Sequence, residues 1–405
     1  MYVHIPFCAT KCPYCDFNTY ARIEPLIPGY VEALATELRA WGSLLDRPEV
    51  STIFFGGGTP SYLPAGALAR LTETIRLGFA VAADAEVTAE ANPDDCTPER
   101  LESMRAAGIN RISLGVQSLD DGLLKVLGRR HDSSQAIRAF GAARAAGFAN
   151  ASLDLMFGLP GQTMAQWTST FEKALALGPD HVSMYGLTVE PNTAFASDIA
   201  AGRLATPDGD LAADMYEFAI DRMSRLGYRH YEISNWALPG RESRHNLAYW
   251  RNAAYLGAGP GAHSYLGQWR FANLKSPREY IRRTSELAHL PPRAFPSRTP
   301  TQGSILAAIE QVRAAGVLES VEAIAPPLEM AETMMMGLRL DDGIDAQAFR
   351  DRFGVAVDTV YGSEIRELVG LGLIEFDMRG VRLTARGQLL GNEVFQRFML
   401  VPQRA

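Results

Sequence analysis

Three cysteines near the start of the chain are the residues with the clearest potential for chemistry. Cys8, Cys12 and Cys15 lie in the segment MYVHIPFCATKCPYCDFN, with three residues between the first pair and two between the second. A structural zinc site usually takes four ligands in two tight pairs, which this loop does not supply. Three thiolates suit an iron–sulfur cubane that is bound at three corners and keeps its fourth iron open. A zinc site completed from elsewhere in the chain, or a chance clustering of thiols, is the alternative.

The residues around the cysteines predict how the loop is positioned. The segment from Tyr2 to Phe7 predicts a short buried strand, so the cysteine loop should leave the end of a strand. Phe7, Tyr14 and Phe17 interleave with the cysteines, and aromatic rings there could shield a cluster from water and oxygen. Cys96 stands alone in NPDDCTPE, and we assign it no role.

A CxxxCxxC loop after YVHIPF resembles the radical S-adenosylmethionine (radical SAM) superfamily. More closely, it is similar to the branch that contains oxygen-independent coproporphyrinogen III dehydrogenase and the HemW heme chaperones. The resemblance implies a [4Fe-4S] cluster whose open iron is chelated by the methionine moiety of S-adenosylmethionine, which the reduced cluster cleaves to a deoxyadenosyl radical. The dehydrogenases carry a further cysteine two residues after the third ligand, where this chain has Phe17. That difference favours the chaperones.

Polar and glycine residues at the ends of predicted strands form the next candidate site. Glycines in the run GGGTP let backbone approach a ligand closely, although a tight turn also needs glycine. Glu90 could accept hydrogen bonds from ribose hydroxyls, and Arg129 could grip a carboxylate with two hydrogen bonds. The alternative for Glu90 and Asp154 is a satisfied buried acid that caps a neighbouring loop. The resemblance implies cofactor contacts at Tyr2, Gly57, Gly58, Thr59, Glu90, Gln117, Arg129, Asp154 and Thr188, and we count Tyr14 of the cysteine loop with them.

A third candidate site is the run RHNLAYW. His245 could ligate heme iron, and the rings of Tyr249 and Trp250 could stack on a macrocycle. The pattern HNxxYW is typical of HemW-like proteins, so the resemblance implies that His245, Asn246, Tyr249 and Trp250 take part in a heme site. The alternative is that His245 and Asn246 hold the loop together while the two rings pack under the barrel.

Strand and helix patterns alternate through about residue 235, which predicts a parallel sheet with helical crossovers. The count of about six βα units falls short of the eight of a closed barrel. We therefore predict an α/β fold with a partial, open TIM-like barrel, as the radical SAM resemblance also implies. The predicted divisions are the barrel at 1–265, a connecting segment with one helix at 266–326, and a C-terminal domain at 327–405.

The last part of the chain predicts a small winged-helix-like domain. Two helical patterns near 345–353 and 358–371 precede the alternating stretch LIEFDMRGVRLT. The methionines at 334–336 look like a buried helix face, not a set of heme ligands. Arg379, Arg382 and Arg386 are scattered among acidic residues, so we expect this domain to cover a substrate or dock a partner and not to bind nucleic acid.

Composition restricts the class of protein. The 405 residues carry a net charge of −7, which provides no global basic field for nucleic acid. No long apolar stretch predicts a membrane span, and the start of the chain leaves no room for a signal peptide, so we expect a cytoplasmic protein. Peripheral contact with membrane proteins stays open.

The sequence leaves two functions. One is a heme chaperone that binds heme and transfers it to an unknown acceptor protein. The other is an oxidoreductase of porphyrin biosynthesis that decarboxylates coproporphyrinogen III, while a radical SAM enzyme with another substrate is a weaker alternative. Phe17 and the HNxxYW run both favour the chaperone, and we assign no catalytic residue.

Overall fold

The computed structural model describes residues 1–290 and 301–399, which form two compact units. The first unit contains residues 1–219 and 255–322, and the second contains residues 220–254 together with the chain from 323 onward. These units do not follow the predicted segments 1–265, 266–326 and 327–405. Residues 220–254 group with the C-terminal part, and residues 266–322 group with the barrel.

The first unit is built on a parallel sheet whose strands follow the order β11-β1-β4-β5-β6-β7-β8. Strands β6 and β7 are buried along almost their whole length, as expected for a parallel sheet that is covered on both faces. Among the described residues β8 does not pair with β11, so the predicted open, partial barrel is confirmed. These strands are β1 (Tyr2–Ile5), β4 (Glu49–Gly57), β5 (Ala80–Ala91), β6 (Arg111–Gln117), β7 (Ala151–Phe157), β8 (His181–Gly186) and β11 (Gly257–Ala258).

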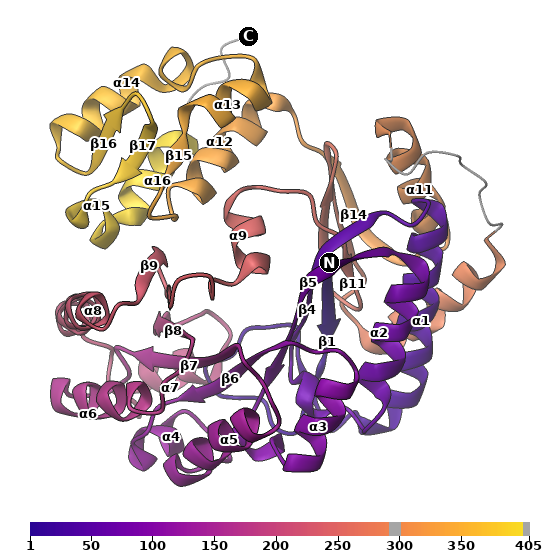
Figure 1. The fold of residues 1–405 in the computed structure, drawn as a ribbon, viewed down its shortest axis with the longest axis horizontal. Helices are drawn as coiled ribbons and strands as arrows, with labels where there is room; N and C mark the ends of the chain where they lie inside the picture. The colour runs from indigo at the N-terminus through magenta and orange to yellow at the C-terminus, as the bar shows by residue number, and fades with distance from the viewer. Residues whose placement is uncertain (291–300, 400–405) are drawn as a thin grey trace. The chain divides into compact units, whose positions relative to one another are not determined.

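Helices of the first unit lie on the outer side of the curved row of strands (Figure 1). Helix α1 shows why: Leu34, Leu38 and Trp41 recur at helical spacing and are fully buried. The helices are α1 (Ile27–Leu44), α2 (Ala67–Gly78), α3 (Pro98–Ala106), α4 (Asp121–Val126), α5 (Ser133–Ala145), α6 (Met164–Leu175), α7 (Ala194–Ala200) and α8 (Gly209–Arg225), which crosses the boundary between the units.

Residues 255–322 are more than the connection with one helix that the sequence predicted. Glu37 of α1 is fully buried and accepts hydrogen bonds from Asn273 Nδ2 at 2.7 Å, from the Gly259 amide at 2.8 Å and from the Tyr280 hydroxyl. These bonds fasten the segment to the barrel. Residues 291–300 of that stretch lie outside the described chain. The segment forms β12 (His263–Leu266), β13 (Trp269–Asn273), α10 (Pro277–Thr284), α11 (Gln302–Ala314) and β14 (Leu318–Ala323).

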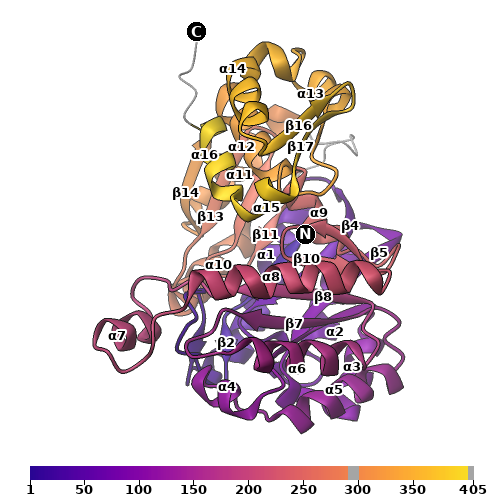
Figure 2. The same ribbon diagram turned by 90° about the vertical axis from the view of Figure 1, so that its left-hand side faces the viewer.

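The second unit has its own core, in which Met334, Phe349, Tyr361 and Phe395 are buried. Its helices α13 and α14 lie beside the strands β16 and β17, so the predicted winged-helix-like arrangement is confirmed (Figure 2). The elements are β9 (Arg229–Glu232), β10 (Asn235–Ala237), α9 (Arg244–Trp250), α12 (Pro326–Gly337), β15 (Ile344–Asp345), α13 (Ala346–Phe353), α14 (Val357–Gly370), β16 (Ile374–Asp377), β17 (Gly380–Leu383), α15 (Ala385–Leu389) and α16 (Gly391–Met399).

Two smaller features complete the fold. Strand β9, the last strand of the alternating pattern, pairs antiparallel with β10, through a register shift between Asn235 and Trp236. Within the described residues, none of the helices is both long enough and apolar enough to cross a bilayer.

Candidate functional site

A cavity of about 370 Å³ opens where the strands of the first unit reach their carboxyl ends. In parallel sheets this edge is the usual place for a ligand. Twelve predicted site residues line the cavity together: Cys8, Cys12, Tyr14, Cys15, Gly57, Gly58, Thr59, Glu90, Gln117, Arg129, Asp154 and Thr188. Residues far apart in the sequence therefore converge on one volume.

The cysteine loop is fixed by backbone contacts at both of its ends. Cys8 belongs to β2 (Phe7–Cys8), which pairs with β3 (Tyr20–Ala21), and the Thr59 amide donates to the Phe7 carbonyl at 2.8 Å. In the middle of the loop, the Phe195 amide donates to the Pro13 carbonyl at 3.0 Å. The ring of Tyr14 packs edge-on against Phe195, with 5.9 Å between ring centroids. The loop is thus held while its thiols stay partly exposed.

Neighbouring donors point at two of the three thiols. Thr59 Oγ1 donates to Cys8 Sγ at 3.4 Å, and Arg129 Nη1 donates to Cys12 Sγ at 3.5 Å. Burial raises the pKa of Cys8 and of Cys15, so an electropositive partner is needed before these thiols ionise. Iron would supply that charge. In the described chain no three His, Cys, Asp or Glu side chains converge on a single metal position, and a cubane does not require this because each thiolate binds a different iron.

The glycine run after β4 brings backbone to the cavity wall. Gly57 has φ +106°, and a Cβ at this position would collide with the imidazole of His4. Only glycine fits both conditions. The Gly57 amide donates to Glu90 Oε2 at 3.0 Å, which ties the end of β4 to the end of β5.

Two acids, Glu90 of β5 and Asp154 of β7, lie at this edge, and β6 separates their strands. Burial, and then the nearby charge of Asp154, raise the pKa of Glu90 to about 7. Burial also raises the pKa of Asp154, although Ser113 Oγ donates to it at 2.9 Å and opposes the shift. Glu90 therefore sits close to half-ionised at neutral pH, and a cationic or hydroxyl-bearing ligand would favour its charged form.

Polar atoms without a partner lie beside these acids. Gln117 ends β6 with φ +65°, a conformation that is unusual for a residue other than glycine. Its Oε1, and Nε of Arg129, are buried and have no hydrogen-bond partner among the described residues. Arg129 Nη2 donates to the Gly115 carbonyl at 2.7 Å and to Asn92 Oδ1, so the guanidinium is fixed in place. Buried polar atoms that lack a hydrogen-bond partner, next to strained backbone, are typical of a site that binds a polar ligand.

Some residues depart from the predicted site. Tyr2 is not one of the described residues that line the cavity; its hydroxyl bonds to His4 Nδ1 at 2.9 Å and its ring stacks on Phe54. Phe7 is buried against Tyr30 and is not one of the described residues that line the cavity. Phe17 lines the cavity and is 63% exposed.

Sequence reasoning missed several wall residues. Asn92 donates to Thr59 Oγ1 at 3.2 Å, and Ser113 bonds Asp154. Asn92 follows β5 directly, and this place after a strand was a signal that could have identified it. Ser113 lies inside a strand and gave no such signal. Gly115, Met156 and Tyr185 are among the other wall residues that it missed.

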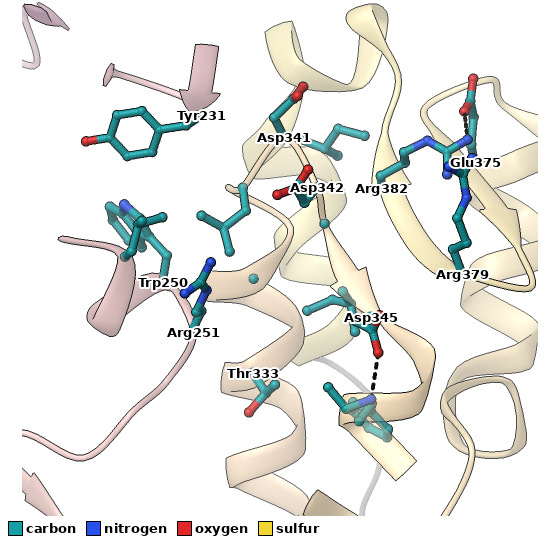
Figure 3. A pocket seen from close by; sticks show the side chains of 18 of the residues that line it. Tyr231, Trp250, Arg251, Thr333, Asp341, Asp342, Asp345, Glu375, Arg379 and Arg382 are labelled. Carbon is teal, nitrogen blue, oxygen red and sulfur yellow. Dashed lines mark hydrogen bonds and ion pairs between the residues drawn. The ribbon is translucent and has the colours of Figure 1, made fainter. Parts of the chain in front are cut away.

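The residues predicted to bind heme lie on α9 in the second unit. His245 is buried, and its Nε2 is 3.1 Å from the hydroxyl of Tyr249, whose ring it meets edge-on. Asn246 lies in the first turn of α9, and its backbone amide donates to Ser243 Oγ at 3.4 Å. Trp250 instead lines a second cavity that belongs wholly to this unit (Figure 3). The structure thus separates Trp250 from the internal pair His245 and Tyr249.

Comparison with known families and proteins agrees with this architecture. The model of the radical SAM superfamily matches residues 2–174, and the model of the HemN C-terminal domain matches residues 324–390. A solved structure, coproporphyrinogen III oxidase (HemN) from Escherichia coli, superposes with a TM-score of 0.79 at 25% identity, covering 98% of this chain and 89% of that one.

Curated relatives are similar along nearly the whole chain. Heme chaperone HemW of Bacillus subtilis is 38% identical over 399 residues, which is 98% of both proteins. Heme chaperone HemW of Escherichia coli is 36% identical over 98% of this chain and 97% of its own. A mouse relative, the mitochondrial radical S-adenosyl methionine domain-containing protein 1, is 35% identical over 96% of this chain and 84% of its own. The chain belongs to the HemW family of heme chaperones, in the radical SAM superfamily.

Proposed function

We propose that this protein binds heme and passes it to an acceptor protein, and that it carries a [4Fe-4S] cluster and S-adenosylmethionine as resident groups. The observation that carries the choice of chaperone over dehydrogenase is Phe17, which lines the mouth of the cysteine cavity where the dehydrogenases of the resemblance have a further cysteine. The names of the full-length relatives support the same choice.

The cysteine cavity fits the two resident groups. Cys8, Cys12 and Cys15 would hold the cluster through their thiolates. Gly57 and Gly58 would offer backbone to the methionine moiety, while Glu90 and Asp154 would take the hydroxyl and cationic groups of the cofactor. The remaining proposed contacts are Thr59, Tyr14, Gln117, Arg129 and Thr188. When bound, the reduced cluster supplies an electron that can break a carbon–sulfur bond of the sulfonium.

For two of the predicted contacts we propose an indirect role. Tyr2 would act through His4, since its hydroxyl bonds that imidazole and the imidazole contacts the Gly57 turn. His245 would brace α9 through Tyr249, because its Nε2 lies 3.1 Å from the Tyr249 hydroxyl. Replacing His245 with alanine should then loosen α9 without changing the axial ligation that the heme spectrum reports. The free thiols of the cluster loop favour a reducing compartment, so we propose the cytosol.

The competing function is decarboxylation of coproporphyrinogen III, which the likeness to HemN favours. One anaerobic preparation with reconstituted cluster, S-adenosylmethionine and reductant separates the two. We expect saturable heme binding, heme transfer to an apo-acceptor and no conversion of coproporphyrinogen III on chromatography. Production of protoporphyrinogen without saturable heme binding would assign the dehydrogenase instead.

A further inference from the structure

Strand β6 ends at the cysteine cavity in a β-bulge that is followed by a tight turn. Its pairing with β7 changes register so that β6 carries one residue more than β7 between Leu114 and Gln117. Bulges of this kind often re-aim a side chain beside an active site. The Ser118 amide then donates to the Val116 carbonyl at 2.8 Å across Gln117, whose φ is +65°. A hydrogen bond between residues two apart, at positive φ, marks the rare and strained form of the γ-turn.

The imidazole of His131 contacts the carbonyl on which this turn closes. The side chain is fully buried, and its Nε2 lies 3.1 Å from the Val116 carbonyl oxygen. A carbonyl oxygen only accepts, so Nε2 carries a proton and donates. His131 is thus a second donor to the oxygen that the Ser118 amide already bonds. It holds the strained turn from outside the cavity, since it is not one of the described residues that line it.

The other ring nitrogen of His131 faces a carboxylate. Nδ1 lies 3.6 Å from Asp94 Oδ1, and neither of these buried atoms has a hydrogen-bond partner among the described residues. Arg130 Nη2 lies 2.7 Å from Asp94 Oδ2. Burial acts to raise the pKa of Asp94, but the neighbouring His131 and Arg130 outweigh it and keep this pKa below its ordinary value. Asp94 is therefore an anion, and a second proton on the imidazole turns the contact into an ion pair.

Arg129, Arg130 and His131 are consecutive residues, and each holds a different part of the cavity edge. Arg129 Nη2 donates to the Gly115 carbonyl at 2.7 Å, one residue before the carbonyl that His131 holds. Arg130 pairs with both acids of the turn Pro93–Asp95, which follows β5. The three side chains therefore join the bulged end of β6 to the end of β5.

We propose that His131 is a positioning residue for S-adenosylmethionine, which acts through the Val116 carbonyl to fix the turn that presents Gln117 to the cavity. The inference rests on the proposed function, in which Gln117 is a cofactor contact, and adds to it a residue that does not touch the cofactor. The alternative is that His131 only stabilises the fold. The two ring nitrogens separate these roles, because Nε2 reaches the turn at Gln117 whereas Nδ1 reaches Asp94.

Two replacements of similar shape each keep one of the two contacts. Glutamine carries its amide nitrogen where imidazole has Nε2, so His131→Gln can still donate to Val116. Asparagine carries its amide nitrogen where imidazole has Nδ1, so His131→Asn can donate to Asp94 but not to Val116. The full-length, cluster-loaded variants are titrated calorimetrically with S-adenosylmethionine. We expect the affinity to fall about tenfold or more in His131→Asn and His131→Ala, and to stay within about threefold of wild type in His131→Gln.

Trp167→Phe is the matched control. The Trp167 ring is fully buried in the same unit, and its Nε1 donates to the Met215 carbonyl at 2.9 Å, so this variant also loses one buried bond from a ring nitrogen to a carbonyl. Trp167 is not among the described residues that line the cysteine cavity. Its replacement should lower the temperature of thermal unfolding and leave the cofactor affinity unchanged. Cluster absorbance is recorded for every variant and should stay at the wild-type level.

The asparagine and glutamine variants decide the test even where His131→Ala does not fold. Wild-type affinity in His131→Asn, or an equal loss in His131→Asn and His131→Gln, overturns the inference and leaves the cofactor site standing. Affinities that follow the unfolding temperature in all variants, Trp167→Phe included, overturn it as well, since His131 would then act only through stability. A wild-type protein that holds its cluster and does not bind S-adenosylmethionine overturns both the inference and the cofactor part of the proposed function.

Discussion

The backbone amide of Gly57 donates a 3.0 Å hydrogen bond to Oε2 of Glu90, and this bond joins the ends of two adjacent strands of the barrel. A loop glycine and a strand carboxylate thereby form one piece of the cavity wall. Gly57 needs its positive φ to present the amide, and Glu90 needs the amide because little water reaches it.

Binding of S-adenosylmethionine should weaken as the pH falls through 7. The pKa of Glu90 is raised to about 7 in the free protein, so the carboxylate must lose a proton before it can accept hydrogen bonds from the cofactor. We expect the affinity to be about tenfold lower at pH 6 than at pH 8, because most of Glu90 is protonated at the lower pH. Calorimetric titration of the cluster-loaded protein at both pH values measures this.

Glu90→Gln supplies the control for that pH dependence. The variant should bind more weakly than wild type at pH 8 and with little change between the two pH values. The stability of the wild type should change with pH in the direction opposite to that of its cofactor affinity. Since the folded pKa lies above the unfolded value, ionising Glu90 costs folding free energy, and wild type should lose stability relative to the variant from about pH 4.5 up to about 7. A pH slope that persists in Glu90→Gln would assign the titration to another group.

Gly57→Ala should destabilise the protein more than a change at an open glycine. Alanine at 57 would be strained at φ +106° and would strike the His4 ring. Gly161 is the matched control, because it has φ +71° but no neighbouring atom within 4 Å of the place that an alanine Cβ would take. We expect about 1 kcal/mol of lost unfolding free energy for Gly161→Ala and about 1–3 kcal/mol more for Gly57→Ala. Denaturant titrations that give equal losses would refute the clash.

Serine at any one of positions 8, 12 and 15 should remove most of the cluster's absorbance and paramagnetic signal, because a hydroxyl is a poor ligand for iron in place of a thiolate. Cys96→Ser is the control. Cys96 is buried and its Sγ bonds the Asn92 carbonyl at 3.3 Å, away from the loop of Cys8. A loss of signal in Cys96→Ser equal to that in the loop variants would show that the ligands have been wrongly assigned.

Glu37→Gln should destabilise the first unit although the two side chains have the same size. The carboxylate accepts only, and donors face both of its oxygens, including the Gly259 amide and Asn273 Nδ2. An amide would place its own donor against one of them and leave buried groups unsatisfied, at a cost of about 2–4 kcal/mol. Glu32→Gln on the exposed side of α1 should cost less than about 1 kcal/mol. Equal unfolding free energies for the two variants would show that the buried network contributes little.

Much of the candidate site could be predicted because its residues stand in short stretches whose pattern can be recognised without the fold. The cysteines lie within one loop, and Gly57, Glu90 and Gln117 each stand at the end of a strand whose pattern is readable. Ser113 could not be predicted in this way, because a serine inside a buried strand is common and its importance comes from Asp154 on the next strand.

The sequence did not reveal which segments of the chain form the second unit, and the reason is different. Residues 220–254 lie far from residue 323 in sequence, and no local pattern connects them. The structure connects them through specific contacts: the Ile233 amide donates to the Arg339 carbonyl at 3.1 Å, and Asn252 Nδ2 donates to Thr333 Oγ1 at 3.0 Å. Such pairings depend on the whole fold, which is why the predicted domain limits followed changes in composition instead.

This arrangement has a consequence for synthesis on the ribosome. Asn252 leaves the exit tunnel 81 residues before Thr333, which is a delay of about 4–16 s at 5–20 residues per second. During that interval Ile233 and Asn252 lack the partners that Arg339 and Thr333 supply. The barrel strands from β1 to β8 are already available by then. A nascent chain of this protein would therefore expose residues 220–254 before the residues that they contact. This segment could complete its fold only when the last helices have emerged.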